Sequence, residues 1–494
     1  MTSTQRYLAI AAIALAAVGV RMHALDRFAT GYDETFSVLE ANGLHPALIP
    51  EYVPFQRAGL VKHDDLAGVR RACIATDGGN GILYLVVLHA WTDVFGNSNV
   101  AVRSLSLCLG LILLVVVYWS ARSIFHDENV AVIALAIAAF TPLLVDYSQE
   151  ARSYSMATIL SLWSTVLFVR IIRQQRPVGA TVLLYGVIAG CGLLTHYLTV
   201  YILLAHAGYT LMSCRSSAHW RGLVISALIT ALILGGWMMM GGSRGLANMA
   251  EVQDLYRTTI EQDPGFDDFI RAATPSSLIQ ESMVQWLWLG GNALQFIGPP
   301  LRVMALTLSI PLALLAVGIW CGGSTRHLLL ILLVISGPLY ALVMSAFAGH
   351  TFGMRYYYVI FSAPAVILLM AYGWMEWWRW PRKWARISAV VVGCVQMSIM
   401  ISSVFWLHAH GHRGNASPEK LAPAAKSITQ LVEAGSSDDH ILLFRDARDA
   451  LLLNLHFEEG MNAMVQRVDT RIPQRILLID RREGIDHAAF VLDL

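Results

Sequence analysis

The sequence has 494 residues, of which 56% are hydrophobic and only 14% charged, and its mean hydropathy is +0.55. Soluble domains carry about 25% charged residues, so this composition excludes an ordinary soluble protein. It indicates an integral membrane protein. The formal net charge of +1 gives no sign of a nucleic-acid partner.

Apolar runs of about 17–25 residues are long enough to cross a bilayer as helices. A further apolar piece, Ile82–Phe95, is shorter and contains His89 and Asp93, so we expect it to lie on the membrane or to re-enter it. The chain is therefore predicted to be mainly α, a polytopic helix bundle. It has eleven candidate spans, 5–24, 99–121, 129–146, 153–172, 178–194, 197–213, 220–240, 303–320, 327–348, 356–378 and 386–407.

Basic residues in the short loops predict the orientation. With the N-terminus in the cytoplasm, the short outer loops contain only Arg152 and Arg355. Positive charge is retained on the cytoplasmic side, so this orientation is favoured, and it would reverse if Ile82–Phe95 spanned the membrane. The inner loops then contain eleven basic residues, Arg122, Arg170, Arg173, Arg176, Arg215, Arg221, Arg326, Arg379, Arg382, Lys383 and Arg386.

The long hydrophilic segments then all lie on the outer face: the first outer loop 25–98, the second large outer loop 241–302 and the tail. Polar groups gathered at one end of a bundle predict a cavity that opens there. We divide the chain into a transmembrane domain, 1–407, and a small extramembrane α/β domain, 408–494. The tail contains an amphipathic helix pattern at 417–435 and three β-type runs, HILLF, RILLID and AAFVLDL.

A pair of carboxylates follows the first span closely, in TGYDETFSVLE. In one interpretation Asp33 and Glu34 are solvated charges near the N-terminus of the next helix. In the other they act at the membrane surface as a general base or hold a cation, where a substrate carried by a lipid would arrive. The pair alone leaves both interpretations open.

Three charges interrupt the apolar sequence in LVDYSQEARSYSM, between two predicted spans. Glu150 and Arg152 would make a surface ion pair of little energetic value in the simpler interpretation. Alternatively, Tyr147, Gln149, Glu150 and Arg152 line the same cavity as Asp33, with the arginine suited to bind phosphate through its planar donors.

Two further sites carry polar groups at span ends. His196 and Tyr197, in GLLTHYLTVY, are either a hydrogen-bonded pair between helices or cavity-lining residues. Arg355 and Tyr356 open the span that contains Pro364. The arginine either extends its charge to the interface while its stem stays in lipid, or holds an anionic headgroup or phosphate.

Taken together, these motifs resemble the GT-C glycosyltransferases of the protein-mannosyltransferase and aminoarabinose-transferase type, families 39 and 83. The resemblance covers roughly residues 5–380, and the YSQEAR turn is its most specific part. The other matching features are the DE pair after the first span, the surface helix ending FG before AVRSLS, the LTHY turn, and the arginine–tyrosine pair that opens a late span containing a proline.

The resemblance implies a reaction in which a sugar passes from a polyprenyl-phosphate donor to a lipid, glycan or protein acceptor outside the membrane. Asp33 matches the catalytic acidic residue of the family's first loop, and Glu34 is expected beside it as a second catalytic residue. Arg355, together with Arg152 and His196, would hold the phosphate. The implied location is the bacterial inner (plasma) membrane, with the active site and the tail extracytoplasmic.

The sequence departs from the family before the surface helix. Many relatives have a His-Pro-Pro-Leu or Lys-Pro-Pro-Leu stretch there, whereas this chain reads TDGGNGILYL. Asp77, Asn80 and Tyr84, or Lys62 and His63 in the same loop, are candidate replacements for the donor contact. No cofactor is specified: Asp33 and Glu34 could hold a divalent cation, Mg²⁺ or Mn²⁺, but no full ligand set is visible.

A transporter or flippase of lipid-linked sugars, without transferase activity, is the competing hypothesis. Such a protein also needs a polar cavity and phosphate-binding arginines. Transporters often contain inverted repeats and helices broken near the bilayer midplane. This chain contains no repeat, and its polar residues gather at one face, which favours the enzyme.

Overall fold

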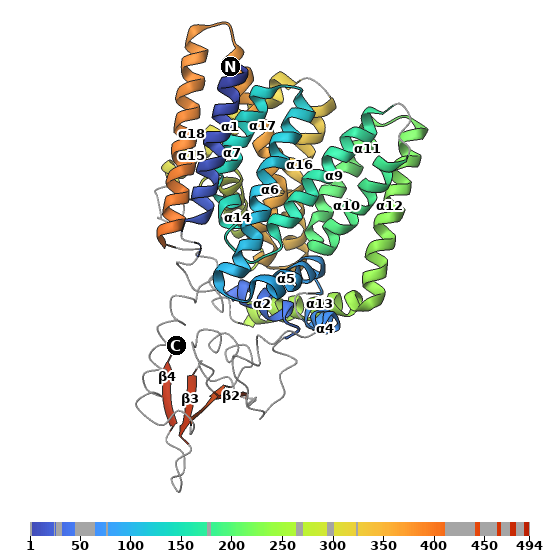
Figure 1. Ribbon diagram of the computed structural model, residues 1–494, viewed down its shortest axis with the longest axis vertical. Coiled ribbons are helices and arrows are strands. Elements are labelled where there is room, and N and C mark those ends of the chain that lie inside the picture. Colours follow the sequence, from blue (N-terminus) through green and yellow to red (C-terminus); the bar gives the residue numbers. More distant parts are fainter. Residues whose placement is uncertain are drawn as a thin grey trace.

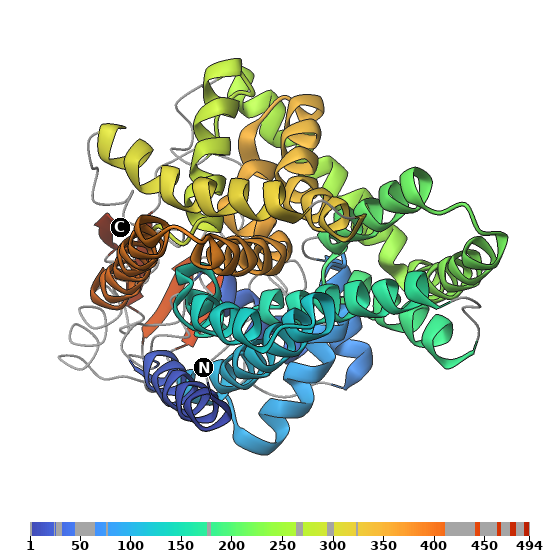
Figure 2. The ribbon, with the colours of Figure 1, turned by 90° about the horizontal axis from the view of Figure 1, so that it is seen from above.

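Helices packed side by side make up most of the protein, and further helices gather at one end of this bundle (Figure 1). The computed structural model describes residues 2–23, 25, 32–44, 65–75, 78–174, 179–262, 270–293, 301–322 and 325–410, with four strands beyond them. Seen along the bundle, α11 and α12 project to one side, while α1 and α18 lie on the opposite side (Figure 2).

Every one of the eleven predicted spans coincides with helix, so the expected helical membrane bundle is confirmed. Among the described residues, seven helices are long and apolar enough to cross a membrane, and α7, α10 and Thr307–Gly322 are shorter apolar helices. The bundle helices are α1 (Ser3–Met22), α6 (Asn99–Phe125), α7 (Glu128–Phe140), α8 (Pro142–Asp146), α9 (Tyr154–Arg173), α10 (Ala180–Thr195), α11 (Val200–Ser213), α12 (Ser217–Trp237), α15 (Leu301–Gly322), α16 (Thr325–Ala348), α17 (Ala363–Arg379) and α18 (Lys383–His410).

Four further helices lie together at one end of the bundle: α2 (Tyr32–Ala41), α4 (Leu66–Ala75), α5 (Ile82–Phe95) and α13 (Ser243–Gln262) (Figure 1). The expected short helix Ile82–Phe95 is thus present as α5. Helix α13 continues from α12 through a π-helical turn, Met238–Gly242, where Gly241 has φ 126°. Only glycine adopts this conformation without strain. At this turn the chain changes direction, from α12, which runs along the bundle, to α13, which lies across its end.

A proline break positions the turn that carries YSQEAR. Pro142 has no N–H, so α7 ends before it and α8 begins with proline in its first turn. The carbonyl groups freed by this break need other donors. Arg21, which is fully buried in α1, donates to Ala139 O at 2.8 Å and to Ala138 O at 3.3 Å. The buried arginine therefore fixes α1 against the end of α7.

The core of the bundle is formed by α17 and the preceding 3₁₀ helix η6 (Tyr356–Ser362), in which all residues from 359 to 371 are buried. α15 packs closely on α17 because two glycines meet: a Cβ on Gly373 would stand 2.0 Å from Leu314 O, and one on Gly318 would stand 2.6 Å from Leu369 O. A side chain at either position would force these helices apart.

The tail contains a four-stranded sheet in the order β2-β1-β3-β4. β1 (His440–Phe444) pairs parallel with β2 (Asn462–Val465) and antiparallel with β3 (Arg475–Asp480), which in turn pairs antiparallel with β4 (Ala489–Asp493). The three β-type runs expected from the sequence are β1, β3 and β4, and β2 was not expected. The helix predicted at 417–435 lies outside the described residues.

Candidate active site

The YSQEAR motif forms a tight turn between α8 and α9. Its backbone is held by hydrogen bonds from Gln149 N to Asp146 O, 2.9 Å, and from Arg152 N to Glu150 O, 2.7 Å. The turn lies at the end of the bundle that also carries α2, and its hydrogen bonds to α2 build the candidate site.

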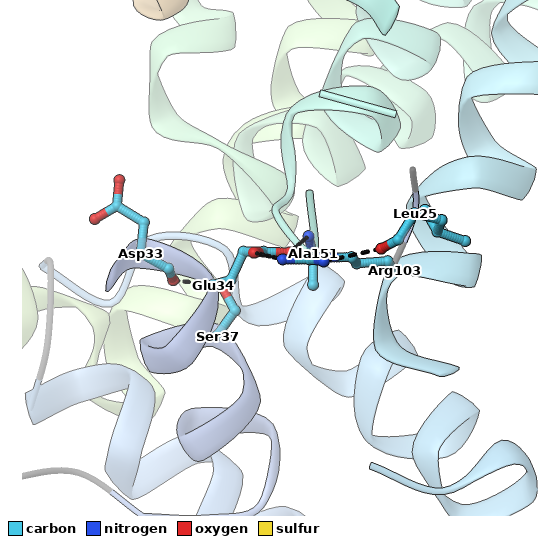
Figure 3. Close-up of polar contacts among 6 residues, drawn as sticks. All are labelled: Leu25, Asp33, Glu34, Ser37, Arg103 and Ala151. Atoms are coloured by element: carbon cyan, nitrogen blue, oxygen red, sulfur yellow. Dashed lines mark hydrogen bonds and ion pairs between the residues drawn. The ribbon is translucent and has the colours of Figure 1, made fainter. Parts of the chain in front are cut away.

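A buried ion pair joins this turn to the first loop. Glu34, 3% exposed, accepts hydrogen bonds from Arg103 Nε at 2.9 Å and Nη2 at 2.6 Å, and also from Ala151 N at 2.8 Å (Figure 3). Arg103 also donates to Leu25 O at 2.9 Å. One cluster therefore connects the end of α1, the start of α2, α6 and the YSQEAR turn.

These contacts change the role that we assign to Glu34. Both of its oxygens are held by Arg103, and one is shared with a backbone N–H. A carboxylate fixed in this way is the acceptor of a structural ion pair and is not available to remove a proton from a substrate. These contacts favour a structural role for Glu34 over the catalytic role that the sequence predicts.

Asp33 points in another direction. Its side chain is half-buried, and its carboxylate turns away from the Glu34–Arg103 pair (Figure 3). Neighbouring residues on an α-helix differ by about 100° in direction, which is why adjacent acids on α2 reach different surroundings. The Asp33 backbone is fixed by Ser37 Oγ, 3.4 Å from its carbonyl oxygen, and by Arg152 Nη1, 3.2 Å from it.

Arg152 brings positive charge to the same place. Its Nη1 also donates to Ser37 Oγ at 3.3 Å, and its guanidinium carbon lies 5.9 Å from the centre of the Tyr154 ring. The structure thus brings the expected residues Asp33 and Arg152 together through backbone and side-chain contacts.

Aromatic side chains form a wall beside these charges. Tyr154 contacts Tyr147 at 4.6 Å, Tyr357 at 5.6 Å and His196 at 5.2 Å between ring centres. Burial raises the pKa of Tyr147 well above its ordinary value, with smaller contributions from Tyr356 and from the charge of half-buried Glu150. Tyr147 therefore stays neutral and does not serve as a base.

His196 and Tyr197 occupy different environments. Burial, with the nearby charge of Arg152, lowers the pKa of His196 to about 3, which disfavours the cationic form of this histidine. The Tyr197 hydroxyl donates to Gly79 O at 3.1 Å and accepts from Trp237 Nε1 at 2.8 Å. Tyr197 thus joins the glycine-rich turn before α5 to α12.

That glycine-rich turn stands where many members of the family that the sequence resembles have a proline stretch. Asn80 Oδ1 accepts from Tyr197 N at 2.8 Å, and Gly78 packs so closely on α13 that a Cβ on Gly245 would stand 2.5 Å from the Gly78 carbonyl carbon. These observations give the turn a packing role. Tyr84, another candidate, is buried in α5, and its hydroxyl lies 3.2 Å from Ser106 Oγ. The remaining candidates for the donor contact in this loop, Lys62, His63 and Asp77, lie outside the described residues.

Arg355 stands between two 3₁₀ helices, η5 (Thr351–Met354) and η6, in an extended conformation with φ −55° and ψ 134°. Its guanidinium carbon lies 5.6 Å from the centre of the Phe352 ring. Burial raises the pKa of Glu281, on α14 (Pro275–Leu289), while the charges of Arg271 and Arg355 oppose this shift. Arg355 is therefore close enough to α14 to act on a carboxyl group there.

Gln149 and Tyr356 are engaged in packing. The amide nitrogen of Gln149 donates to Arg21 O at 2.9 Å and to His23 O at 2.7 Å, and its oxygen lies 3.1 Å from Nε2 of His408. Its polar groups thus hold the end of α1 to α18. The Tyr356 ring stacks on Trp288 of α14, with 4.2 Å between ring centres.

Arg103 is the residue of this region that the sequence analysis did not select. It belongs to the AVRSLS run and is the only charged residue between Asn99 and Tyr118. A lone charge inside an apolar span requires a partner, and the sequence offers several acids for it, among them Asp93 and the DE pair. The signal was present, although the partner could not be chosen from spacing alone.

The arrangement does not favour a cation held between Asp33 and Glu34, because Glu34 is bound to Arg103 and the two side chains diverge. Within the residues that the structure describes, no group of three or more His, Cys, Asp or Glu side chains gathers as a metal-ligand set.

Comparisons with known proteins agree on the fold. The family model for dolichyl-phosphate-mannose-protein mannosyltransferase matches residues 80–237, a segment that includes the YSQEAR and LTHY turns but neither Asp33 nor Arg355. No curated protein sequence matches the chain.

Two solved proteins are similar in structure. ArnT from Cupriavidus metallidurans bound to undecaprenyl phosphate superposes with a TM-score of 0.54 at 12% identity, over 92% of this chain and 85% of that one. The Archaeoglobus fulgidus oligosaccharyltransferase tethered with an acceptor peptide has a TM-score of 0.53 at 11% identity, over 88% of this chain and 58% of that one. This chain thus spans less than two thirds of the archaeal enzyme. The expected resemblance to GT-C glycosyltransferases is confirmed at the level of the fold.

Proposed function

We propose that the protein is a membrane glycosyltransferase that moves a sugar from a polyprenyl-phosphate donor to an acceptor on the extracytoplasmic face. The observation that carries this proposal is the separation of two adjacent acids. Glu34 is bound in a buried ion pair, whereas the Asp33 carboxylate turns away from that pair while Arg152 binds the Asp33 backbone. The fold and the family-model match point to the same class of reaction.

In this proposal Asp33 accepts the proton of the acceptor hydroxyl. The acceptor oxygen forms a bond to the sugar's anomeric carbon, and the bond from that carbon to the phosphate oxygen breaks. The electron pair leaves with the lipid phosphate, whose negative charge increases. Arginine donors that bind this charge more strongly as it develops would lower the barrier. Arg355 is the proposed phosphate ligand, and Arg152, beside Asp33, is the second.

The class of donor follows from the proteins that share the fold. ArnT has been crystallised with undecaprenyl phosphate, and the matching family model describes an enzyme that uses dolichyl-phosphate mannose. A polyprenyl phosphate that carries a hexose or a pentose is therefore the proposed donor. The acceptor is a lipid, a glycan or a protein hydroxyl.

A transfer assay tests this proposal. The purified full-length protein is incubated with a panel of polyprenyl-phosphate sugars, and the released polyprenyl phosphate and the transferred or hydrolysed sugar are measured. We expect turnover of at least one donor. Movement of a donor across a vesicle membrane with its sugar still attached, and no turnover, would instead support the transporter.

The location proposed for the active site is the extracytoplasmic side of a bacterial plasma membrane. The excess of Lys and Arg in the loops at the other end supports this orientation. Helix α2, which carries Asp33, and the strands of the tail lie at the same end of the bundle (Figure 1). We therefore also propose that 408–494 is an extracytoplasmic domain and that 1–407 is the catalytic one.

Cysteine labelling should report the same orientation. In a chain whose six native cysteines are replaced, Asp254→Cys on α13 should react with a membrane-impermeant thiol reagent in intact spheroplasts. Lys383→Cys, at the start of α18, should react only after the membrane is opened. Both side chains are exposed, so access to the reagent depends on the side of the membrane. Labelling of Lys383→Cys in intact spheroplasts would contradict the proposed topology.

A further inference from the structure

The segment that carries Arg355 is fixed to a different part of the chain. The N–H of Thr351 donates to Arg271 O at 2.9 Å, and its hydroxyl accepts from Arg271 N at 3.0 Å. The N–H of Ala273 donates to Gly349 O at 2.9 Å. The strand-like piece before α14 thus anchors the start of this segment, between α16 and η6.

Gln285 of α14 holds the residue before Arg355. Its side chain is fully buried, and its Nε2 donates to Met354 O at 2.9 Å. A backbone carbonyl only accepts hydrogen bonds, so the amide nitrogen of Gln285, and not its oxygen, must face Met354 O. Met354 is itself fully buried, so its carbonyl has no access to bulk water as a replacement donor.

Trp288 of α14 holds the residue after Arg355. Its ring is fully buried and lies parallel to that of Tyr356, with an angle of 8° between the ring planes and 4.2 Å between their centres. Gln285 and Trp288 are three residues apart and therefore lie on one face of α14. One face of α14 therefore contacts both sequence neighbours of Arg355, Met354 and Tyr356.

We infer that Gln285 and Trp288 are positioning residues that set the direction of the Arg355 guanidinium. The inference rests on the proposed function, in which Arg355 binds the phosphate of the donor. Arg355 lies in extended backbone between two short helices, so regular helical bonding does not by itself define its orientation. The guanidinium fork binds a phosphate well only in a suitable direction, and the α14 contacts supply that direction.

The test compares variants of the full chain in detergent by their affinity for undecaprenyl phosphate. Gln285→Met keeps an unbranched side chain of similar length and removes the hydrogen bond, and Trp288→Phe keeps an aromatic ring but reduces the stacking area. Each should bind the lipid phosphate about tenfold more weakly, because a misdirected guanidinium loses part of its charge-assisted hydrogen bonding to the phosphate. Arg355→Ala should bind it more weakly still.

A second buried glutamine provides a matched control. Gln396 of α18 is 2% exposed and donates to Gly290 O at 2.7 Å, at the end of the same α14. Gln396→Met loses the same kind of bond without touching the Arg355 segment, so its affinity should stay at the wild-type value. This control separates the positioning effect from a general loosening of the bundle.

Non-additivity distinguishes positioning from stability. In the Arg355→Ala background, Gln285→Met should weaken binding no further, because no guanidinium is left to be oriented. If Arg355→Ala binds weakly while Gln285→Met and Trp288→Phe bind normally, or if the effects add, the positioning role is overturned and the phosphate role of Arg355 stands. Normal binding by Arg355→Ala would overturn both.

Discussion

Asp33→Asn should leave the protein folded and lower the rate of sugar transfer about 10²–10⁴-fold, the range expected when a general base is lost. The change is nearly isosteric. Among the described residues no hydrogen bond to the Asp33 carboxylate is present, and the contacts that fix this residue involve its backbone carbonyl. The measurement is the single-turnover rate with a saturating donor, together with the affinity for undecaprenyl phosphate, which should stay within a few-fold of the wild type.

Asp254→Asn is the matched control for this experiment. It removes the same charge from an exposed position on α13, at the same end of the bundle, and should transfer at the wild-type rate. A near-normal rate for Asp33→Asn would remove Asp33 from the mechanism. Because Glu34 is held by Arg103, the search for a base would then turn to Glu150, the half-buried acid of the YSQEAR turn.

Arg103→Met should lower the free energy of unfolding by about 3–5 kcal/mol, because it leaves the buried Glu34 carboxylate without its charged partner. The side chains of this pair are only 6% and 3% exposed. The loss also removes a donor from Leu25 O and thus a connection to the end of α1. Denaturant unfolding in detergent micelles measures the change, and the activity that remains at low temperature shows whether folded molecules still turn over.

Arg122→Met provides the comparison on the same helix. Arg122, at the other end of α6, pairs with Glu128 at 2.7 Å, but its side chain is 59% exposed. Removal of such an exposed pair should cost about 0.2–1 kcal/mol. The double variant Glu34→Leu with Arg103→Met should recover only part of the loss, because Ala151 N would remain buried without its acceptor. Equal effects of Arg103→Met and Arg122→Met would contradict a structural role for the Glu34 pair.

Local patterns predicted the elements of this fold well. The apolar runs predicted the bundle helices because a helix needs about twenty consecutive apolar residues to cross a bilayer. Such a run can be recognised in a short window of sequence. Short windows of sequence also predicted α5, β1 and β3, whose boundaries match those of the predicted runs. The strand β2, Asn462–Val465, was missed because its four residues are too short for a β-type pattern to be recognised.

The sequence determined the candidate site only as a set of polar groups near span ends. It indicated that Asp33, Arg152 and Arg355 would lie on one face, because helix ends on the same side of a membrane are fixed by the count of spans. It did not determine their partners. Gln149 caps α1 and contacts His408, a residue 259 positions away, and no local pattern records a contact of that range.

The sequence by itself determined that this chain is a multi-span membrane protein, and it indicated which loops would gather polar residues, because both properties depend on the composition of short segments. Only the tertiary structure showed that Asp33 and Glu34 have different surroundings. The two residues are adjacent and chemically almost equal, and their contacts differ because α2 turns by about 100° from one to the next. That rotation directs Glu34 toward Arg103 and the N–H of Ala151, and directs Asp33 away from them.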